Sequence, residues 1–338
     1  MSERCVAWAP GRVNLIGEHT DYSGGLVLPV AIQYGVTVDV SGGEDVITLR
    51  SERFGSAEPF AADGSGDPVA GWGRYAQAVA AELAALGRPP AGLSGTVASD
   101  LPSGAGLSSS AALEVAIGLA LCAVAGFELE PFELALACQR AELRAVGVPC
   151  GILDQAASIL GRAGHALLLD CGSLEHRLVP VPPEAALVVI DSGVEHSHET
   201  SGYAQRRREL EAGVPRRVRH VRTENERVTR FAAVLERGDL PAAGELLLAS
   251  HASLRDDYEV STPELDLLVE LALDAGAYGA RLLGGGFGGS ILALADAGRA
   301  QEVGRVAAAE YRRRTGREGQ TLVAVPSAGA AVLAGESV

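Results

Sequence analysis

The chain has 338 residues, and its 43 acidic against 28 basic residues give a formal net charge of −15. All of the basic residues are arginine, and the absence of lysine excludes a Walker A loop, a protein-kinase strand lysine and Schiff-base chemistry. With 47% hydrophobic and 21% charged residues, the composition is globular, and the length favours two domains. The acidic balance argues against nucleic acid or an anionic membrane as the main partner.

The sequence shows no sign of export or membrane insertion. No cationic and apolar leader is present before Pro10, and the longest uncharged apolar run, Val115–Phe127, is shorter than the ~18–20 residues of a membrane span. The five cysteines are far apart and form no C-x-x-C pair, which favours free thiols in a reducing compartment. We therefore expect a cytoplasmic protein.

Helices and strands are mixed along the chain without strict β-α-β alternation. In the first half of the chain we expect a strand over Val27–Val40, an exposed loop over Ala61–Gly73, and helices over Arg74–Leu86, Ser108–Ala125 and Phe132–Leu143. Two short strands follow, over Ala166–Asp170 and Ala186–Asp191. In the second half we expect helical stretches over Gln205–Arg237, Leu240–Leu254 and from Pro263 to near Ala275, and then a strand over Ser290–Ala295. Three prolines in Leu178–Pro183 interrupt strand pairing and give the best domain boundary. The prediction is an α+β fold with domains at residues 1–180 and 181–338.

The segment Leu101–Ser110 (LPSGAGLSSS) leads directly into the apolar helix predicted from Ser108. Its two glycines let the backbone approach a ligand closely, and the helix start offers unpaired N–H groups and the positive end of the helix dipole. A glycine turn with a serine cap explains one serine and one glycine. Three serines and two glycines exceed what capping requires, so the segment favours phosphate binding.

A second glycine cluster, Gly284–Gly289 (GGGFGG), formally matches G-x-G-x-x-G. It follows a predicted helix and precedes a predicted strand, which reverses the order of a dinucleotide-binding fingerprint. Two interpretations remain: a hairpin turn, or a loop whose bare backbone passes close to a bound ligand.

Several polar side chains lie close together in Gly11–Gly25, which has no amphipathic period. They are Arg12, Asn14, Glu18, His19 and Asp21. A solvated loop explains the polarity but not the embedded Leu15 and Ile16. We therefore expect a loop that lines a cleft, with carboxylates, an amide and an imidazole suited to sugar hydroxyls.

Two acidic residues flank the loop at Gly147–Gly151. Glu142 lies at the end of one predicted helix, and Asp154 opens the next. An Asp in the first turn of a helix is usually a cap, but together with an anion-binding helix start it becomes a candidate base. Glu142 becomes a candidate Mg²⁺ ligand.

Taken together, these segments resemble the galactokinases, within the GHMP sugar and metabolite kinases. Pro10–Ile32 is similar to the galactokinase signature, Leu101–Glu114 to the shared phosphate loop, and Pro149–Gln155 to the segment with the catalytic aspartate. Leu254–Asp266 and Gly284–Gly289 resemble the C-terminal blocks of the family. Mevalonate-type relatives place a lysine near this aspartate, and this chain has none.

The resemblance implies a two-domain α+β fold with the active site in the cleft between the domains. It implies Mg²⁺-dependent transfer of the γ-phosphoryl group of ATP to the anomeric hydroxyl of α-D-galactose, with Asp154 as base and Arg12 as its charged neighbour. The sugar would be held by Glu18, His19, Asp21, the backbone of Gly151 and Tyr203. The phosphates would be held by Gly104, Ala105, Gly106, Leu107, Ser108, Ser109 and Ser110. Ser110 and Glu142 would hold Mg²⁺.

Three other classes stay open. Sibling kinases for arabinose, galacturonate or N-acetylgalactosamine would share these motifs. A silent galactose sensor should have lost the serines or the aspartate, yet Ser108–Ser110 and Asp154 are present. Nine arginines against four glutamates between Arg206 and Arg230 would suit a nucleic-acid binder, although solvated helix faces are the usual explanation. We expect partners limited to the sugar and ATP, no nucleic acid, no membrane, and a monomer or weak homo-oligomer.

Overall fold

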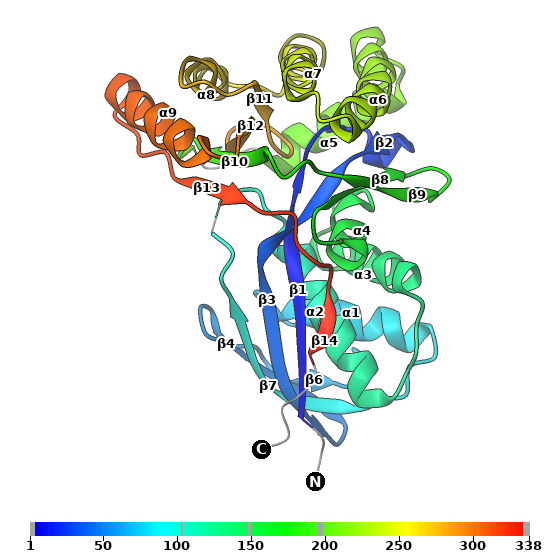
Figure 1. Ribbon diagram of the computed structural model, residues 1–338. Coiled ribbons are helices and arrows are strands. Elements are labelled where there is room, and N and C mark those ends of the chain that lie inside the picture. The colour runs from blue at the N-terminus through cyan, green and yellow to red at the C-terminus, as the bar shows by residue number, and fades with distance from the viewer. Residues whose placement is uncertain (1–3, 103, 148–149, 195–198, 334–338) are drawn as a thin grey trace.

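The computed structural model describes residues 4–102, 104–147, 150–194 and 199–333 (Figure 1). Ser103 and Pro149, which belong to two of the motifs above, lie outside these residues. The described chain forms three sheets covered by helices, and it confirms the α+β prediction. The division at residue 180 stays a prediction.

The largest sheet holds the N-terminal strands (Figure 1). In spatial order it contains β14 (Ala331–Leu333), β1 (Arg4–Asn14), β3 (Pro29–Gly43), β7 (Gly92–Ser99), β4 (Val46–Ser51) and β5 (Gly55–Ser56), with β6 (Phe60–Ala61) beside β4. β4 and β7 are parallel and the other pairs are antiparallel. The register between β1 and β3 shifts between Pro10 and Arg12, where the polar side chains of Gly11–Gly25 begin.

Three helices cover one side of this sheet, as Figure 1 shows. They are α1 (Gly73–Ala85), α2 (Ser109–Ala125) and α3 (Pro131–Val146). α2 packs on β1 and β3, while α1 and α3 pack on α2 and on each other. Most of α2 is buried, as its continuous apolar sequence predicts. Its N-terminus is thereby fixed near the C-terminal end of β1, where the backbone N–H of Arg12 donates to the carbonyl of Leu107.

A smaller three-stranded sheet and one short helix lie beside the N-terminal end of β3. The strands are β2 (Leu26–Val27), β8 (His165–Asp170) and β9 (His176–Pro180), and the helix is α4 (Leu153–Leu160). α4 packs on β1 and α2, which brings its first turn to the start of α2.

A four-stranded antiparallel sheet carries the second half of the chain. Its order is β11 (Gly279–Leu282), β12 (Ser290–Asp296), β10 (Ala185–Asp191) and β13 (Thr321–Ala324). The helices of this half are α5 (Glu199–Glu211), α6 (Pro215–Glu236), α7 (Leu240–Ser253), α8 (Pro263–Asp274) and α9 (Ala300–Thr315), and a π-helical turn, Leu254–Tyr258, follows α7. α7, α8 and α9 lie above the sheet in Figure 1.

The predicted interruption of strand pairing is confirmed, and one predicted helical stretch is wrong. β9 pairs with β8 only as far as Pro180, so the strand ends at the first of the three prolines in Leu178–Pro183. β9 is the edge strand of its sheet, where proline needs no partner on the open side. The stretch Gln205–Arg237 is not continuous, since α5 and α6 are separated at Gly213, whose φ is +74°. All five cysteines are free, as expected.

None of the helices within the described residues has the length and apolar character needed to cross a bilayer.

Candidate functional site

The serine-rich segment forms a loop and the first turn of α2. Gly104 and Gly106 have φ values of +76° and +68°, which only glycine adopts without strain. Ser108 is the N-cap residue but its side chain makes no capping hydrogen bond. Its hydroxyl donates instead to Oδ2 of Asp154. The N–H groups at the start of α2 therefore have no serine cap competing for them, which suits an anion.

Arg12 joins this loop to the first turn of α4. Its Nε donates to Oδ1 of Asp154 at 2.7 Å, and its Nη1 donates to the carbonyl of Gly106 at 2.7 Å. Burial opposes the charge of Arg12, but the carboxylates of Asp154 and Glu18 outweigh burial and raise the pKa of Arg12. The Asp154 side chain is 28% exposed, so a ligand can reach the carboxylate that Arg12 and Ser108 orient.

A cavity of about 260 Å³ lies at this contact. All of the predicted catalytic and sugar-binding residues line it, together with side chains that the sequence did not single out. The lining consists of Arg12, Glu18, His19, Asp21, Glu142, Val146, Cys150, Gly151, Leu153, Asp154, Tyr203, Gly284 and Gly285. These residues come from β1 and the loop after it, α3, the α3–α4 connection, α4, α5 and the β11–β12 connection. The structure therefore brings distant segments together in one polar cavity.

Asp21 and Gly151 are packed tightly against each other in the cavity wall. A Cβ atom added to Gly151 would lie 1.9 Å from Oδ2 of Asp21, so only glycine fits here. Burial raises the pKa of Asp21 to about 7, and the neighbouring carboxylates of Asp154 and Glu18 add to this effect. A carboxyl group with this pKa can accept or donate a hydrogen bond near neutral pH.

Glu18 is held from both halves of the fold. Its Oε2 accepts from Nδ2 of Asn14 at 3.0 Å, and its Oε1 accepts from the backbone N–H of Gly284 at 2.9 Å. Arg281, which is fully buried, reaches Oε1 at 3.2 Å through Nη1 and Nη2. Glu18 thus connects the glycine cluster to the polar segment Gly11–Gly25. The cluster connects β11 and β12, which confirms the hairpin turn. Gly284 and Gly285 also line the cavity, and the close approach of this backbone to a ligand stays a prediction.

Ser110 and Glu142, the expected Mg²⁺ ligands, are in direct contact. The Ser110 hydroxyl donates to Oε1 of Glu142 at 2.8 Å, while Gln155 donates to Oε2 at 2.6 Å. Burial and the neighbouring Asp154 raise the pKa of Glu142. Among the described residues, no group of three or more His, Cys, Asp or Glu side chains is arranged to hold a metal ion. One carboxylate and one hydroxyl fit Mg²⁺ that is held mainly by substrate phosphates.

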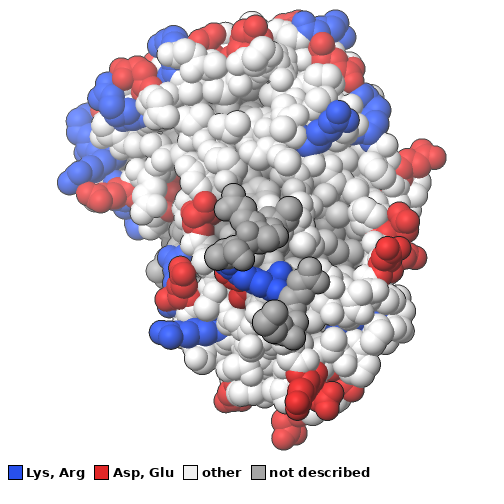
Figure 2. Space-filling view, turned by 60° about the horizontal axis from the view of Figure 1, so that its bottom comes forward, with Lys and Arg blue, Asp and Glu red and all other residues white. Residues whose placement is uncertain are grey.

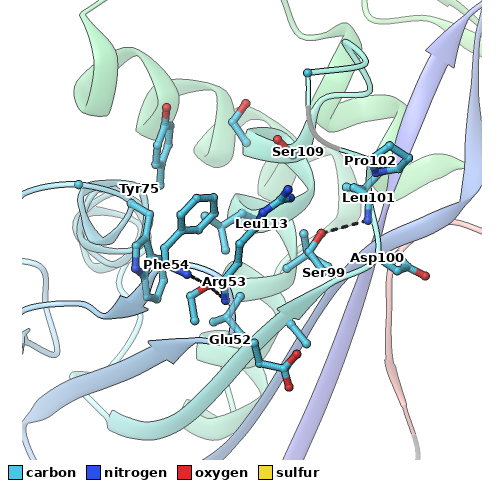
Figure 3. A pocket seen from close by; sticks show the side chains of 18 of the residues that line it. Glu52, Arg53, Phe54, Tyr75, Ser99, Asp100, Leu101, Pro102, Ser109 and Leu113 are labelled. Carbon is cyan, nitrogen blue, oxygen red and sulfur yellow. Dashed lines mark hydrogen bonds between the residues drawn. The ribbon is translucent and has the colours of Figure 1, made fainter. Parts of the chain in front are cut away.

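A larger cavity of about 970 Å³ lies on the other side of the serine-rich loop (Figure 3). Phe54 from the β4–β5 turn and Tyr75 from α1 line one side of it, and Leu101 and Pro102 line the other. Trp72 also lines it. Ser109 and Ser110 of α2 belong to its wall, and Ser110 contacts Glu142 of the smaller cavity. The start of α2 therefore separates an aromatic cavity from a polar one.

Sequence reasoning missed this aromatic wall. Residues 61–73 were expected only to form an exposed loop, yet Trp72 stands at its end and lines the cavity. The W-x-x-Y spacing of Trp72 and Tyr75 at a helix start was the available signal. Phe54 could not be connected with them, because it comes from a distant turn.

Three models of known protein families match the chain. Residues 1–41 match the model of the galactokinase galactose-binding signature, residues 74–162 the GHMP kinases N terminal domain, and residues 231–313 the GHMP kinases C terminal domain. The chain is 43% identical to the galactokinase of Chloroflexus aggregans over 96% of this chain and 92% of the relative. It is 44% identical to that of Bos taurus over 87% of this chain and 84% of the relative.

A solved structure agrees over nearly the whole fold. The crystal structure of Lactococcus lactis galactokinase complexed with galactose matches with a TM-score of 0.93 and 32% identity, covering 98% of this chain and 95% of that one. With this identity and coverage, the chain belongs to the galactokinase family of the GHMP kinases.

Proposed function

We propose that the chain transfers the γ-phosphoryl group of ATP to the anomeric hydroxyl of α-D-galactose, with Mg²⁺ as cofactor. The observation that carries this proposal is the Arg12–Asp154–Ser108 contact, which joins the polar cavity to the start of α2, where we expect the phosphates to bind. Family membership supports a sugar kinase that uses ATP.

The polar cavity has the chemistry of a sugar site. Glu18, His19, Asp21, the backbone of Gly151 and Tyr203 would contact sugar hydroxyls. Asp154 would orient the attacking hydroxyl and accept its proton, while Arg12 keeps that carboxylate in place and balances its charge. The positive end of α2 would stabilise charge on the phosphates. Mg²⁺, when bound through Ser110 and Glu142, would neutralise further phosphate charge.

The direct test is ADP release with the purified protein, ATP and Mg²⁺ against a panel of free sugars. We expect the highest kcat/KM with galactose. A preference for arabinose, galacturonate or N-acetylgalactosamine would reassign the substrate. ADP release with none of them would favour a sensor and overturn the proposal.

The fit between Asp21 and Gly151 gives a sharp test of the sugar site. Gly151→Ala is expected to raise the KM for galactose at least ~10-fold, because the new methyl group would displace the Asp21 carboxylate. The KM for ATP should stay near the wild-type value. Gly43→Ala is a matched control on β3, where the nearest atom to an added Cβ is 3.5 Å away. Equal galactose KM values in both variants would remove this contact from sugar binding.

The aromatic cavity is the proposed site of the nucleotide base. Trp72→Ala is expected to raise the KM for ATP at least ~5-fold, which is the order expected for loss of an aromatic contact to a base. The KM for galactose should not change. Trp8, the other tryptophan of the chain, is equally half-buried but lies on β1 outside the cavity, and Trp8→Ala serves as control. A larger ATP effect in Trp8→Ala would contradict the assignment.

The arginine-rich stretch in α5 and α6 is engaged in ion pairs. Arg217 contacts Glu209 and Glu259, Arg219 contacts Asp257, and Arg227 contacts Glu224. In Figure 2, blue and red side chains are interspersed and neither forms a continuous patch on the visible face. These pairs support the prediction that nucleic acid is not a partner, which a retention assay at low salt would check. The cytoplasmic location and the monomer or weak homo-oligomer stay predictions.

A further inference from the structure

His19 lies in the wall of the polar cavity with both ring nitrogens occupied by protein groups. Its backbone has a φ of +62°, an uncommon value for a residue other than glycine, within the polar segment Gly11–Gly25. Nδ1 is 3.0 Å from the hydroxyl of Tyr22, and Nε2 is 3.2 Å from the carbonyl oxygen of Gly285. His19 and Gly285 both line the cavity.

These contacts determine the proton positions along a chain of groups. The carbonyl of Gly285 can only accept, so its contact with Nε2 of His19 favours the hydrogen on that nitrogen, and a Tyr22 hydroxyl that donates to Nδ1 favours it further. Burial and the nearby His220 lower the pKa of His19 to about 3, so the ring is neutral and Nδ1 is an acceptor. Tyr22 must then donate to Nδ1. Its oxygen, 2.7 Å from that of Tyr258, accepts in turn from the Tyr258 hydroxyl.

Tyr258, the first donor of this series of hydrogen bonds, is held in a fixed position by its surroundings. It is fully buried in the π-helical turn after α7, and its ring centroid lies 4.6 Å from that of His220 and 4.7 Å from that of His19. The guanidinium of Arg217 lies 5.7 Å from the same ring centroid. Burial raises the pKa of Tyr258 to about 12, so its hydroxyl keeps its proton. The C-terminal half of the fold thereby sets the hydrogen-bond direction at the cavity.

We propose that Tyr258 and Tyr22 are positioning residues that hold His19 as the Nε2–H tautomer, so that the cavity presents a donor beside the acceptor carbonyl of Gly285. The inference rests on the proposed use of this cavity as the sugar site. A hydroxyl group both accepts and donates, so one sugar hydroxyl can share the Nε2–H that points to the Gly285 oxygen at 3.2 Å and donate to the second lone pair of that oxygen. In the Nδ1–H tautomer two acceptors would face that hydroxyl, and one of the pairings would be lost.

Steady-state kinetics of variants that lack one or both tyrosine hydroxyls test this series of hydrogen bonds. Tyr22→Phe is expected to raise the KM for galactose about three- to tenfold, the order expected for one neutral hydrogen bond, with kcat and the KM for ATP within about twofold. Tyr258→Phe should have a smaller effect of the same kind. The double variant should match Tyr22→Phe alone, because the Tyr258 hydroxyl acts only through Tyr22.

Tyr311→Phe is the matched control. Tyr311 is also fully buried in the C-terminal half, and its hydroxyl donates to the carbonyl of Ser192 at 2.9 Å, outside the cavity. It should lower stability and leave the KM for galactose unchanged. An unchanged galactose KM in Tyr22→Phe, or additive effects of the two deletions, would overturn the inference.

A spectroscopic measurement separates this inference from the proposed function. In ¹⁵N-histidine-labelled wild-type protein, the His19 signals, identified by their loss in His19→Asn, should show the Nε2–H tautomer. In Tyr22→Phe they should shift towards a mixture of tautomers. A Nδ1–H tautomer in the wild-type protein would overturn the positioning role, whereas an absence of ADP release with galactose would overturn the proposed function instead.

Discussion

Asp154→Asn is expected to lower kcat with galactose at least ~100-fold, the order that positioned acid–base and electrostatic groups contribute. The substitution keeps the shape of the side chain and one acceptor for Nε of Arg12. Its amide can donate to the Ser108 hydroxyl, which reverses its role from donor to acceptor. The fold should therefore survive, and the loss should reflect the missing carboxylate. Steady-state ADP release, with circular dichroism as a check of folding, measures this effect.

A control of the same chemistry is available on the surface. Asp256 forms an exposed ion pair with Arg255, so Asp256→Asn removes a carboxylate that also contacts an arginine but lies outside both cavities. Its kcat should equal that of the wild type. Near-normal turnover in Asp154→Asn would remove Asp154 from the mechanism.

Arg281→Met is expected to destabilise the protein by about 3–5 kcal/mol, because it leaves a buried carboxylate without its cation. Besides Glu18, the guanidinium of Arg281 donates to the carbonyls of Leu15 at 2.7 Å and Leu282 at 2.6 Å, and to that of Asn14. Several buried acceptors therefore lose their donor at once. The midpoint of urea denaturation, measured with unchanged slope, reports the change.

Two further variants define the origin of this effect. Arg305→Met breaks an exposed pair with Glu302 and should barely move the midpoint. Adding Glu18→Gln to Arg281→Met should recover part of the loss, because it removes the uncompensated charge. A double variant less stable than Arg281→Met would show that Glu18 is stabilised without its arginine.

The sequence predicts elements that carry their own signal. The continuous apolar character of α2 predicts a buried helix, and Thr262 with Pro263 predicts the start of α8, where the Thr262 hydroxyl caps the N–H of Leu265. β1 was not predicted. From Ala9 to Asn14 every residue is buried, so the alternation that marks a strand is absent. Its ladder depends on β3, which no local pattern reveals.

In the site too, residues that form a local sequence motif could be predicted, whereas residues that meet only on folding could not. The polar side chains from Arg12 to Asp21 and the serine-rich helix start are contiguous in sequence, and the structure brings them together around Asp154. The supports of these groups come from elsewhere. Arg281 lies in β11 and Tyr258 in the π-helical turn, so only the folded chain shows that they contact Glu18 and Tyr22.

The pairing of β14 with β1 has a consequence for biosynthesis. β1 is flanked by β3 on one side and by β14 on the other, and β14 comprises residues 331–333. Until residues 331–333 have been synthesised, the edge of β1 at Val6–Trp8 therefore lacks its partner strand, although β3 pairs with the other side much earlier. Such an open edge is a template for intermolecular pairing. The arrival of β14 covers these three residues and removes that template.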